Sequence, residues 1–526
     1  MSERGFLSIV LHAHLPFVRH PEHERFLEED WLFEAIVETY LPLIEVLDGL
    51  DKDGIKETIT LSLSPTLISM LDDDLLRERT SAHFDRLVRL AEAETIRTKS
   101  DPPPFRSLAH FYKDRIERMR ALYGDIDRDI AGAFDRLADR GQLHLITCAA
   151  THGFLPLLDE PSAVKAQVFV ARDQYTERFG RPPAGIWLPE CAFRPGLDRV
   201  LADAGIEFFF LDTHGITNAS PSPRGAHYTP IRTPAGPVAF GRDPESSESV
   251  WSSEVGYPGD PVYRDFYRDV GFDREEDYIR PFIHPDGIRC FTGIKYHAVT
   301  GDTDEKKPYD PRAAMEQACI HAKHFVSSRI ARLESEGRSM DSPPIITAPF
   351  DAELFGHWWF EGPEFLGQVL REAAQCQDRI RVTDPASYLD TTPSIPAGIP
   401  PECSWGAGGH WAVWLNEKND WIYPHLERTG RAMEAAVHSH PDPDPWSHRV
   451  LRQMGRELML AQASDWPFIL NAGTAVDYAN QRIHSHVDRF EQLLSMLDEA
   501  SQNDKALASM EATDNLFPSL DIQHWS

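Results

Sequence analysis

Short apolar runs that each end in polar residues recur along this chain of 526 residues, with helix-prone stretches between several of them. Apolar runs of four to eight residues are typical of buried strands. Strands that alternate with helices fold into a parallel sheet or barrel with the helices outside. The runs cover residues 6–11, 57–63, 143–147, 184–188, 207–211 and 345–349. We therefore predict an α/β fold with polar side chains gathered at the carboxyl ends of the strands.

The composition predicts three parts. Residues 77–141 are charged, helix-prone and poor in strand signals, which indicates a helical insertion between two strands. Apolar residues recur at helical spacing near the end of the chain, so residues 401–526 are predicted to form a C-terminal helical domain. Residues 1–76 and 142–400 then form one discontinuous barrel domain.

Two segments carry little periodicity. Residues 215–265 are rich in Gly, Pro and Ser and are predicted to form a long irregular loop, which inside a compact domain is usually functional or mobile. The last dozen or so residues are predicted to be a loosely ordered tail.

The formal net charge is −30, from 53 basic and 83 acidic residues. This charge repels phosphate, so it argues against a nucleic-acid partner and suits a neutral substrate. No apolar run approaches the roughly 18 residues that a membrane span needs, so we expect no membrane partner and a cytoplasmic location.

The six cysteines include no C-x-x-C pair, which predicts reduced thiols rather than a zinc or disulfide framework.

Two carboxylates follow strand-like runs, Glu190 after residues 184–188 and Asp351 after residues 345–349. An unpaired buried carboxylate is costly, so each belongs either to a structural ion pair or to a reactive site. Two carboxyl groups that face one cleft are what glycoside cleavage requires: one attacks or stabilises the sugar cation, and the other protonates the leaving oxygen. Glu353 is a nearby competitor, which could instead be an ion-pair partner.

Alternating histidines follow the first run, at His12 and His14, and His152 follows the third. Side chains two residues apart in an extended segment point the same way and could bind a metal together. A catalytic zinc usually needs a third protein ligand, which His152 or Asp351 could supply. The alternatives are hydrogen bonding in a sugar pocket and burial as satisfied core residues, and the residues alone leave all three open.

Tryptophans gather near the second carboxylate and beyond it. Trp358 follows Asp351 by seven residues, and Trp405 and Trp414 flank the glycine-rich residues 406–409. Flat indole rings can stack on pyranose rings, although some of these side chains could be core residues. The glycine-rich segment lacks a Gly-Lys-Ser/Thr ending and a preceding strand, so it is not a phosphate loop.

Five separated segments resemble glycoside hydrolase family 57, in order and over nearly the whole chain. They are HAHLP at 12–16, TCAATHGFLP at 147–156, WLPEC at 187–191, APFDAELFGHWW at 348–359 and SWG at 404–406. The resemblance implies a distorted (β/α)7 barrel with a helical inserted domain and a helical C-terminal domain.

The same resemblance implies roles for the site residues. It implies a retaining mechanism in which Glu190 is the nucleophile and Asp351 the general acid/base, with no metal and no cofactor. His12, His14 and His152 then contact the substrate or orient the carboxylates.

The 1,4-α-glucan branching enzymes of that family look most similar, in three further places. Tyr257, in the loop 251–260, would close over the site; Trp405 and Trp414 would bind the substrate, as would Trp358; and Asp465 would reach the cleft from residues 464–468. One departure is His297, where relatives can carry an aromatic residue for sugar stacking.

The resemblance implies a transglycosylase that cleaves α-1,4 links and forms α-1,6 branches in amylose- or glycogen-type glucans, as a monomer or weak homo-oligomer. A 4-α-glucanotransferase or an α-amylase-type hydrolase of the same family is the alternative, and an inactive glycan-binding protein is an alternative of another class.

Overall fold

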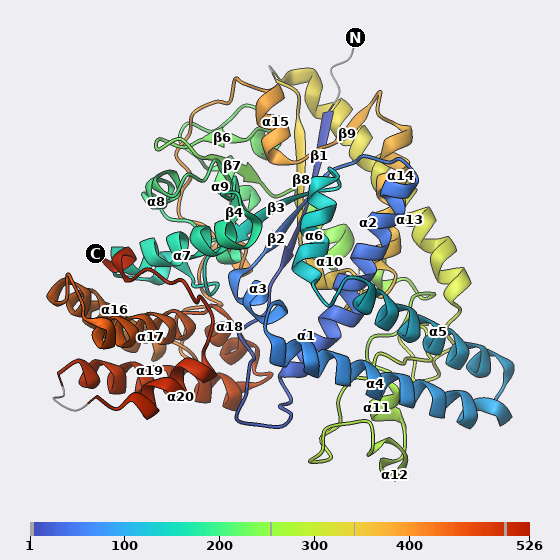
Figure 1. Cartoon of the computed structure of the whole chain (residues 1–526). Helices are drawn as coiled ribbons and strands as arrows, with labels where there is room; N and C mark the ends of the chain where they lie inside the picture. Colours follow the sequence, from blue (N-terminus) through green and yellow to red (C-terminus); the bar gives the residue numbers. More distant parts are fainter. Residues whose placement is uncertain (1–4, 253–254, 341, 499–501) are drawn as a thin grey trace.

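The computed structural model describes residues 5–252, 255–340, 342–498 and 502–526. A sheet lies at the centre of the molecule and helices surround it (Figure 1). Within the described residues the sheet has nine strands. They are β1 (Gly5–Ala13), β2 (Ile59–Leu63), β3 (Leu143–Cys148), β4 (Gly185–Trp187), β5 (Phe208–Leu211), β6 (Ile231–Arg232), β7 (Val238–Gly241), β8 (Ile345–Asp351) and β9 (Ile380–Val382).

The strand order is β6-β7-β5-β4-β3-β2-β1-β8, and β9 pairs with the start of β1. Every pair on this path is parallel except β6 with β7. A parallel bridge between Arg242, directly after β7, and Thr347 of β8 connects the two ends of the parallel part. In the described chain, seven parallel strands therefore close into an irregular barrel, which confirms the predicted (β/α)7 architecture.

Helices connect the strands on the outside, as the short apolar runs predict. Between β1 and β2 lie α1 (Glu29–Ala35), a π-helical turn (Ile36–Tyr40) and α2 (Leu41–Lys52). The later connections include α7 (Pro161–Phe179), α8 (Leu197–Asp203), α9 (Thr213–Thr217), α10 (Pro244–Trp251), α11 (Val270–Asp273), α12 (Glu276–Ile279), α13 (Pro311–Glu336), α14 (Gly362–Gln375) and α15 (Pro385–Thr391).

Helices also fill the chain between β2 and β3. They are α3 (Pro65–Leu71), α4 (Asp74–Arg97), α5 (Pro103–Asp125) and α6 (Ile130–Asp139). Asp73 starts α4 because its carboxylate accepts the Leu76 N–H. Helices α4 and α5 pack against each other and extend to one edge of the molecule (Figure 1), whereas α6 packs on β3 and α2. The helical content agrees with an insertion, and its limits at 77 and 141 stay a prediction.

The prediction of an irregular loop over residues 215–265 is wrong for much of that segment. It contains β6, β7 and α10, and β7 completes the barrel. The apolar run of β7 spans four residues between Pro237 and Arg242, so the flanking Gly and Pro residues hide it from a periodicity search. Ser253 and Glu254, in the expected lid loop, lie outside the described residues.

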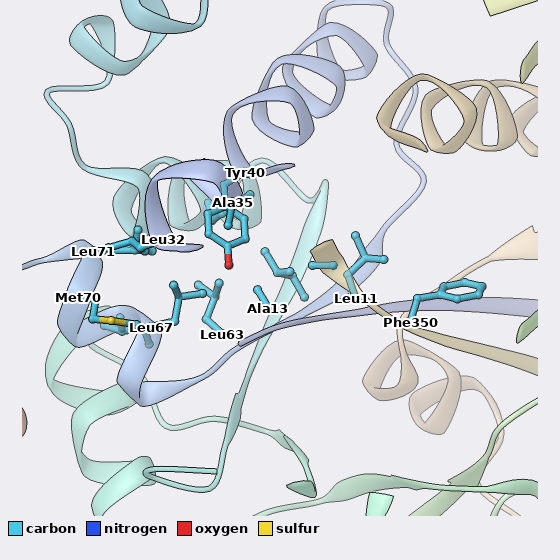
Figure 2. Packing of buried hydrophobic residues seen from close by; sticks show 14 of the residues in the cluster. Leu11, Ala13, Leu32, Ala35, Tyr40, Leu63, Leu67, Met70, Leu71 and Phe350 are labelled. Carbon is cyan, nitrogen blue, oxygen red and sulfur yellow. The ribbon is translucent and has the colours of Figure 1, made fainter. Parts of the chain in front are cut away.

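The core lies between the sheet and the helices that cover it. Figure 2 shows Leu11 and Ala13 of β1 beside Leu63 of β2, facing Leu32, Ala35 and Tyr40 from the first helical connection. Because successive strand residues point to opposite faces, Leu11 and Ala13 share the face that meets these helices. Burial of these side chains holds the barrel strands at fixed positions and so holds the residues at their ends.

In the described part of the C-terminal region the α-helices are α16 (Ile422–Ser439), α17 (Pro445–Ala461), α18 (Asp465–Ala472), α19 (Val476–Asp498) and α20 (Asp504–Thr513). They lie together beside α7 (Figure 1). The prediction of a loose tail is wrong, because Phe517 and Trp525 are fully buried and the last turn packs on α7. Among the described residues, no helix combines the length and the apolarity that crossing a membrane requires.

Candidate active site

The predicted residues gather at the carboxyl ends of the barrel strands. His12, in β1, lies beside Asp351 at the end of β8 and beside Ser62 of β2 in the sheet register. His152 follows β3, and Glu190 follows β4. Parallel strands present their carboxyl ends at one edge, so residues that are far apart in the sequence meet there.

Glu190 lies on a tight turn, Pro189–Cys191, with a left-handed backbone at φ 61° and ψ 21°. A non-glycine residue in this region carries strain that the surroundings must hold in place. The Trp405 N–H donates to the Glu190 carbonyl oxygen at 3.0 Å, and Phe193 pairs with Cys403 just beyond. Residues 403–405 therefore fix the turn, and the turn directs the carboxylate into the site.

Both oxygens of the Glu190 carboxylate accept hydrogen bonds. The Trp405 Nε1–H donates to Oε2 at 2.8 Å, and the Ser464 hydroxyl donates to Oε1 at 2.9 Å. Donors on both oxygens favour the ionised form and fix the plane of the carboxylate. The sequence indicates the segment that contains Ser464 but not the serine itself, because the serine gives no local signal and lies 274 positions from Glu190.

A chain of hydrogen bonds leads from Ser62 to Glu190. His12 contacts Ser62 Oγ through Nδ1 at 3.1 Å and His152 Nε2 through its own Nε2 at 3.0 Å, and His152 Nδ1 contacts Ser464 Oγ at 2.8 Å. The Ser464 hydroxyl donates its proton to Glu190, so Ser464 Oγ must accept a hydrogen bond from His152 Nδ1–H. In a neutral His152 ring Nε2 then carries no proton, so it accepts from His12 Nε2–H. Burial lowers the pKa of His12 and of His152 well below the usual value, so both rings are neutral.

His14 forms a separate pair with Asp465 of the C-terminal region. Its Nε2 lies 3.2 Å from both Asp465 oxygens, and its Nδ1 contacts Ser64 Oγ at 2.9 Å. Burial opposes the charged form of His14, but the Asp465 carboxylate outweighs burial and raises the His14 pKa. The His14 ring also stacks on His152, with centroids 3.8 Å apart. Asp465 therefore reaches the barrel end, and α18 completes the site.

Burial raises the pKa of Glu190 to about 7 and the pKa of Asp351 to about 6. Trp405 and Ser464 oppose this shift at Glu190, and the Arg242 guanidinium opposes it at Asp351. Repulsion from Asp351 adds to the rise at Glu190. The two carboxyls titrate as a pair, so the order of the two values does not assign the roles. Between these values the pair holds one proton, as a nucleophile and an acid together require.

Glu353 and Arg242 complete the charged surroundings. Glu353 accepts the Tyr40 hydroxyl at 2.5 Å, and burial raises its pKa to about 7. Arg242 lies over the Trp405 ring, 5.4 Å from its centroid, and 3.8 Å from Asp212. Arg242 was missed in the sequence because it follows β7, the strand hidden in the predicted loop.

The aromatic residues that are expected to bind the substrate differ in their exposure and in their contacts with the site. Trp405 contacts Glu190 directly, and Trp358 is 54% exposed. Trp414 is only 2% exposed and packs against Phe154. In this conformation its indole ring is covered and cannot stack on a sugar, contrary to the expected substrate contact. The Tyr257 ring lies on His321 of α13, and its hydroxyl bonds His324. Its described contacts are thus with α10, α13 and α14 rather than with either carboxylate.

His297 lies at the edge of this region. Its ring meets Phe105 edge to face, with centroids 6.0 Å apart, and burial lowers its pKa. Residue 297 is thus packed partly on α5, and the expectation that it departs from an aromatic residue of its relatives stays a prediction.

Two groups of side chains in the site have potential ligand atoms within 4.8 Å of one another: His12, Cys148 and His152, and His14, His152 and Asp465. The ring nitrogens of His12 and His152 are already joined to each other and to Ser62 and Ser464. A metal would have to break these hydrogen bonds. The absence of a required metal stays a prediction.

Dialysis against EDTA is expected to leave the rate of glucan turnover within twofold of the untreated enzyme. Metal analysis of the dialysed protein provides the control for complete removal. A loss of activity that Zn²⁺ restores would place a metal at these histidines and contradict the prediction.

The pH profile of kcat/KM is expected to be bell-shaped, with apparent pKa values near 6 and near 7. Below the lower value both carboxyls are protonated and no nucleophile is available. Above the higher value both are ionised and no acid is available. Ser464→Ala removes a donor to Glu190, so its profile is expected to move to higher pH. A flat profile between pH 5 and pH 8 would contradict this electrostatic arrangement.

A barrel of parallel strands with two partly buried carboxylates of raised pKa and aromatic rings at its carboxyl end defines a glycoside-cleaving enzyme. Residues 8–390 match the model of Glycosyl hydrolase family 57, and residues 425–525 match the model of the C-terminal region of 1,4-alpha-glucan branching enzymes. The chain belongs to glycosyl hydrolase family 57.

Relatives of named function align with almost the whole chain. A 1,4-alpha-glucan branching enzyme of Thermococcus kodakarensis is 32% identical, over 98% of this chain and 77% of that protein. The solved structure of a branching enzyme from Pyrococcus horikoshii has a TM-score of 0.89 at 33% identity and covers 99% of this chain and 96% of its own. The alpha-amylase AmyC of Thermotoga maritima has a TM-score of 0.93 at 41% identity, with 99% of both chains covered.

Proposed function

We propose that this protein is a 1,4-α-glucan branching enzyme that works by a retaining transglycosylase mechanism. The observation that carries the proposal is the branching-enzyme C-terminal region at residues 425–525, which supplies two contacts inside the site. Asp465 binds His14 and Ser464 binds Glu190. The region that matches branching enzymes is therefore part of the reaction centre and not an appended module.

In the first step Glu190 attacks the anomeric carbon of an α-1,4-linked glucan. The bond from that carbon to the leaving oxygen breaks, and Asp351 gives its proton to that oxygen. The product is a glycosyl ester on Glu190 with inverted configuration. Trp405 and Ser464 hold the carboxylate for this attack, and the neutral histidine chain behind Ser464 fixes the direction of its hydrogen bond.

In the second step Asp351, now ionised, takes the proton of a 6-hydroxyl on an acceptor glucan. The acceptor oxygen attacks the anomeric carbon, the ester bond to Glu190 breaks, and an α-1,6 branch forms with the original configuration. Water in the place of the acceptor gives hydrolysis, so the outcome depends on how the site holds the acceptor and excludes water.

Hydrolysis is the second candidate, and the likeness to the Thermotoga maritima alpha-amylase favours it. Both activities share the cleavage step and the two carboxylates. They differ only in the acceptor, which the catalytic pair alone does not determine.

The test is linkage analysis of amylose after incubation with the enzyme. Branching is expected to give α-1,6 anomeric signals in the ¹H NMR spectrum without an equal rise in reducing ends, and a debranching isoamylase should release the transferred chains. A rise in reducing ends without α-1,6 links would support hydrolysis. Neither product, from a protein that still binds amylose, would support an inactive binding protein.

The proposed substrates are amylose- and glycogen-type glucans, and the proposed setting is the cytoplasm. All six cysteines are free thiols, which suits a reducing compartment. A monomer or weak homo-oligomer, with no nucleic-acid or membrane partner, completes the proposal, and sedimentation velocity tests the oligomeric state.

A further inference from the structure

An exposed group of aromatic residues adjoins the segment that carries Asp351. Trp358, Tyr267 and Phe272 are 54%, 76% and 43% exposed. Aromatic side chains are usually mostly buried, and an exposed apolar group marks a binding surface. Together with Phe266 and Phe291, which lie between them, these three residues are called the aromatic platform below.

The rings of the aromatic platform form a continuous series. Trp358 stacks on Phe266, with centroids 4.6 Å apart and planes 19° apart. Phe266 meets Tyr267 at 5.2 Å and Phe291 at 5.3 Å, and Phe291 meets Phe272 at 5.0 Å. The exposed rings are therefore linked by direct contact rather than scattered over the surface.

Buried polar groups hold the platform from behind. The Lys295 ammonium lies 4.2 Å from the Phe266 centroid and 4.6 Å from the Phe291 centroid, and it donates to the Phe266 carbonyl at 2.6 Å. The buried Asp269 carboxylate accepts the Thr292 N–H at 3.0 Å and its hydroxyl at 2.7 Å. These contacts fix the two segments relative to each other, so a ligand would meet preformed rings and pay little ordering entropy.

The platform begins beside the reaction centre. The Trp358 N–H donates to the Glu353 carbonyl at 3.1 Å. Glu353 is two residues from Asp351, a span of at most about 7 Å. A polymer bound at Glu190 and Asp351 could therefore continue over Trp358 onto the other rings.

The chemistry of the platform fits a neutral polysaccharide. Flat amphipathic rings present apolar faces that match the apolar face of a pyranose ring. The Arg268–Asp273 ion pair, at 3.0 Å, places hydrogen-bonding groups beside the rings. A net charge of −30 disfavours anionic ligands.

We infer that the aromatic platform is a second binding surface for the α-glucan polymer, adjoining the site of the two carboxylates, that retains long chains between transfers. The inference rests on the proposed function. It assigns Tyr267 and Phe272 to polymer binding away from the cleaved bond, and it makes Trp358 the junction between the two regions.

The test compares the Tyr267→Ala/Phe272→Ala double variant with wild type on two substrates. Native gels that contain amylose measure polymer binding, and a chromogenic maltotrioside measures cleavage of a short chain. The double variant is expected to bind amylose on the order of tenfold more weakly and to cleave the short substrate within twofold of wild type. Trp358→Ala is expected to impair both. Ile96→Ala, which removes an exposed apolar side chain from α4, is the control and is expected to behave as wild type.

The outcomes separate the two proposals. Unchanged amylose binding by the double variant would overturn the platform while leaving the proposed function intact, and so would an equal loss on both substrates. A change of oligomeric state in sedimentation velocity would overturn it as well, because the rings would then form a protein interface. Wild-type protein that neither binds nor converts amylose would overturn the proposed function and the platform with it.

Discussion

Replacing Glu190 by Gln is expected to lower kcat by roughly 10⁴-fold or more, because the amide cannot form the glycosyl ester on which both steps depend. The geometry should survive, since the amide oxygen can still accept one of the hydrogen bonds from Trp405 and Ser464. Steady-state rates on amylose measure the loss. Azide added to the variant with an α-glucosyl fluoride should give the β-azide, because the small anion replaces the missing nucleophile and inverts the centre.

The same substitution is expected to stabilise the fold at neutral pH. The folded-state pKa of Glu190 is raised to about 7, so the folded state binds more protons than the unfolded state above the ordinary carboxyl value. Stability therefore falls as pH rises through this window, by about 1 to 3 kcal/mol at pH 8. Glu190→Gln removes this cost. Calorimetry should show a higher melting temperature at pH 8 and a smaller difference at pH 5.

Glu457 offers a matched control for Glu190. It is a fully buried carboxylate in the C-terminal region, and burial raises its pKa to about 7 as well. Its hydrogen-bond partners are Gln453 and His486, remote from the barrel end. Glu457→Gln is expected to leave kcat within a few-fold of wild type. An equal loss in both variants would mean that burial of a carboxylate, and not nucleophilic attack, explains the Glu190 result.

Asp351→Asn is expected to lower kcat on amylose by about 10³-fold, the size of a lost general acid. The expected loss is much smaller on an α-glucosyl fluoride, because fluoride departs without a proton. Azide should then give the α-azide, since it attacks the ester already formed on Glu190. The opposite configurations of the azide products from the two variants distinguish the nucleophile from the acid/base.

Glu353→Gln is the control at the second carboxylate. Glu353 lies partly buried two residues from Asp351, with a raised pKa and a hydrogen bond from Tyr40. The decrease in kcat for Glu353→Gln should be smaller than the decrease for Asp351→Asn, and it should not depend on the leaving group. If the leaving-group dependence appeared in the Glu353 variant instead, the acid/base role would belong to Glu353.

The barrel strands could be predicted because each buries an apolar run and ends in a polar residue, as at Glu190 and Asp351. The strand β7 could not, because its four residues lie between glycine and proline signals, and Arg242 was missed with it. Ser464 could not be predicted as a partner of Glu190, because the contact depends on how the C-terminal helices pack against the end of the barrel. The burial of Trp414 results from its packing against Phe154. That contact joins residues far apart in the chain, so it could not be predicted from the local sequence.

The hydrogen bond between Ser464 and Glu190 connects residues 274 positions apart in the chain. During synthesis the barrel strands emerge long before α18, so a nascent chain carries both carboxylates before it carries Ser464 or Asp465. Until α18 docks, Glu190 lacks one of its two donors and His14 lacks its counter-ion. Docking of α18 is therefore also the event that completes the hydrogen bonds of Glu190, and under the proposed mechanism activity reports that the C-terminal helices are in place.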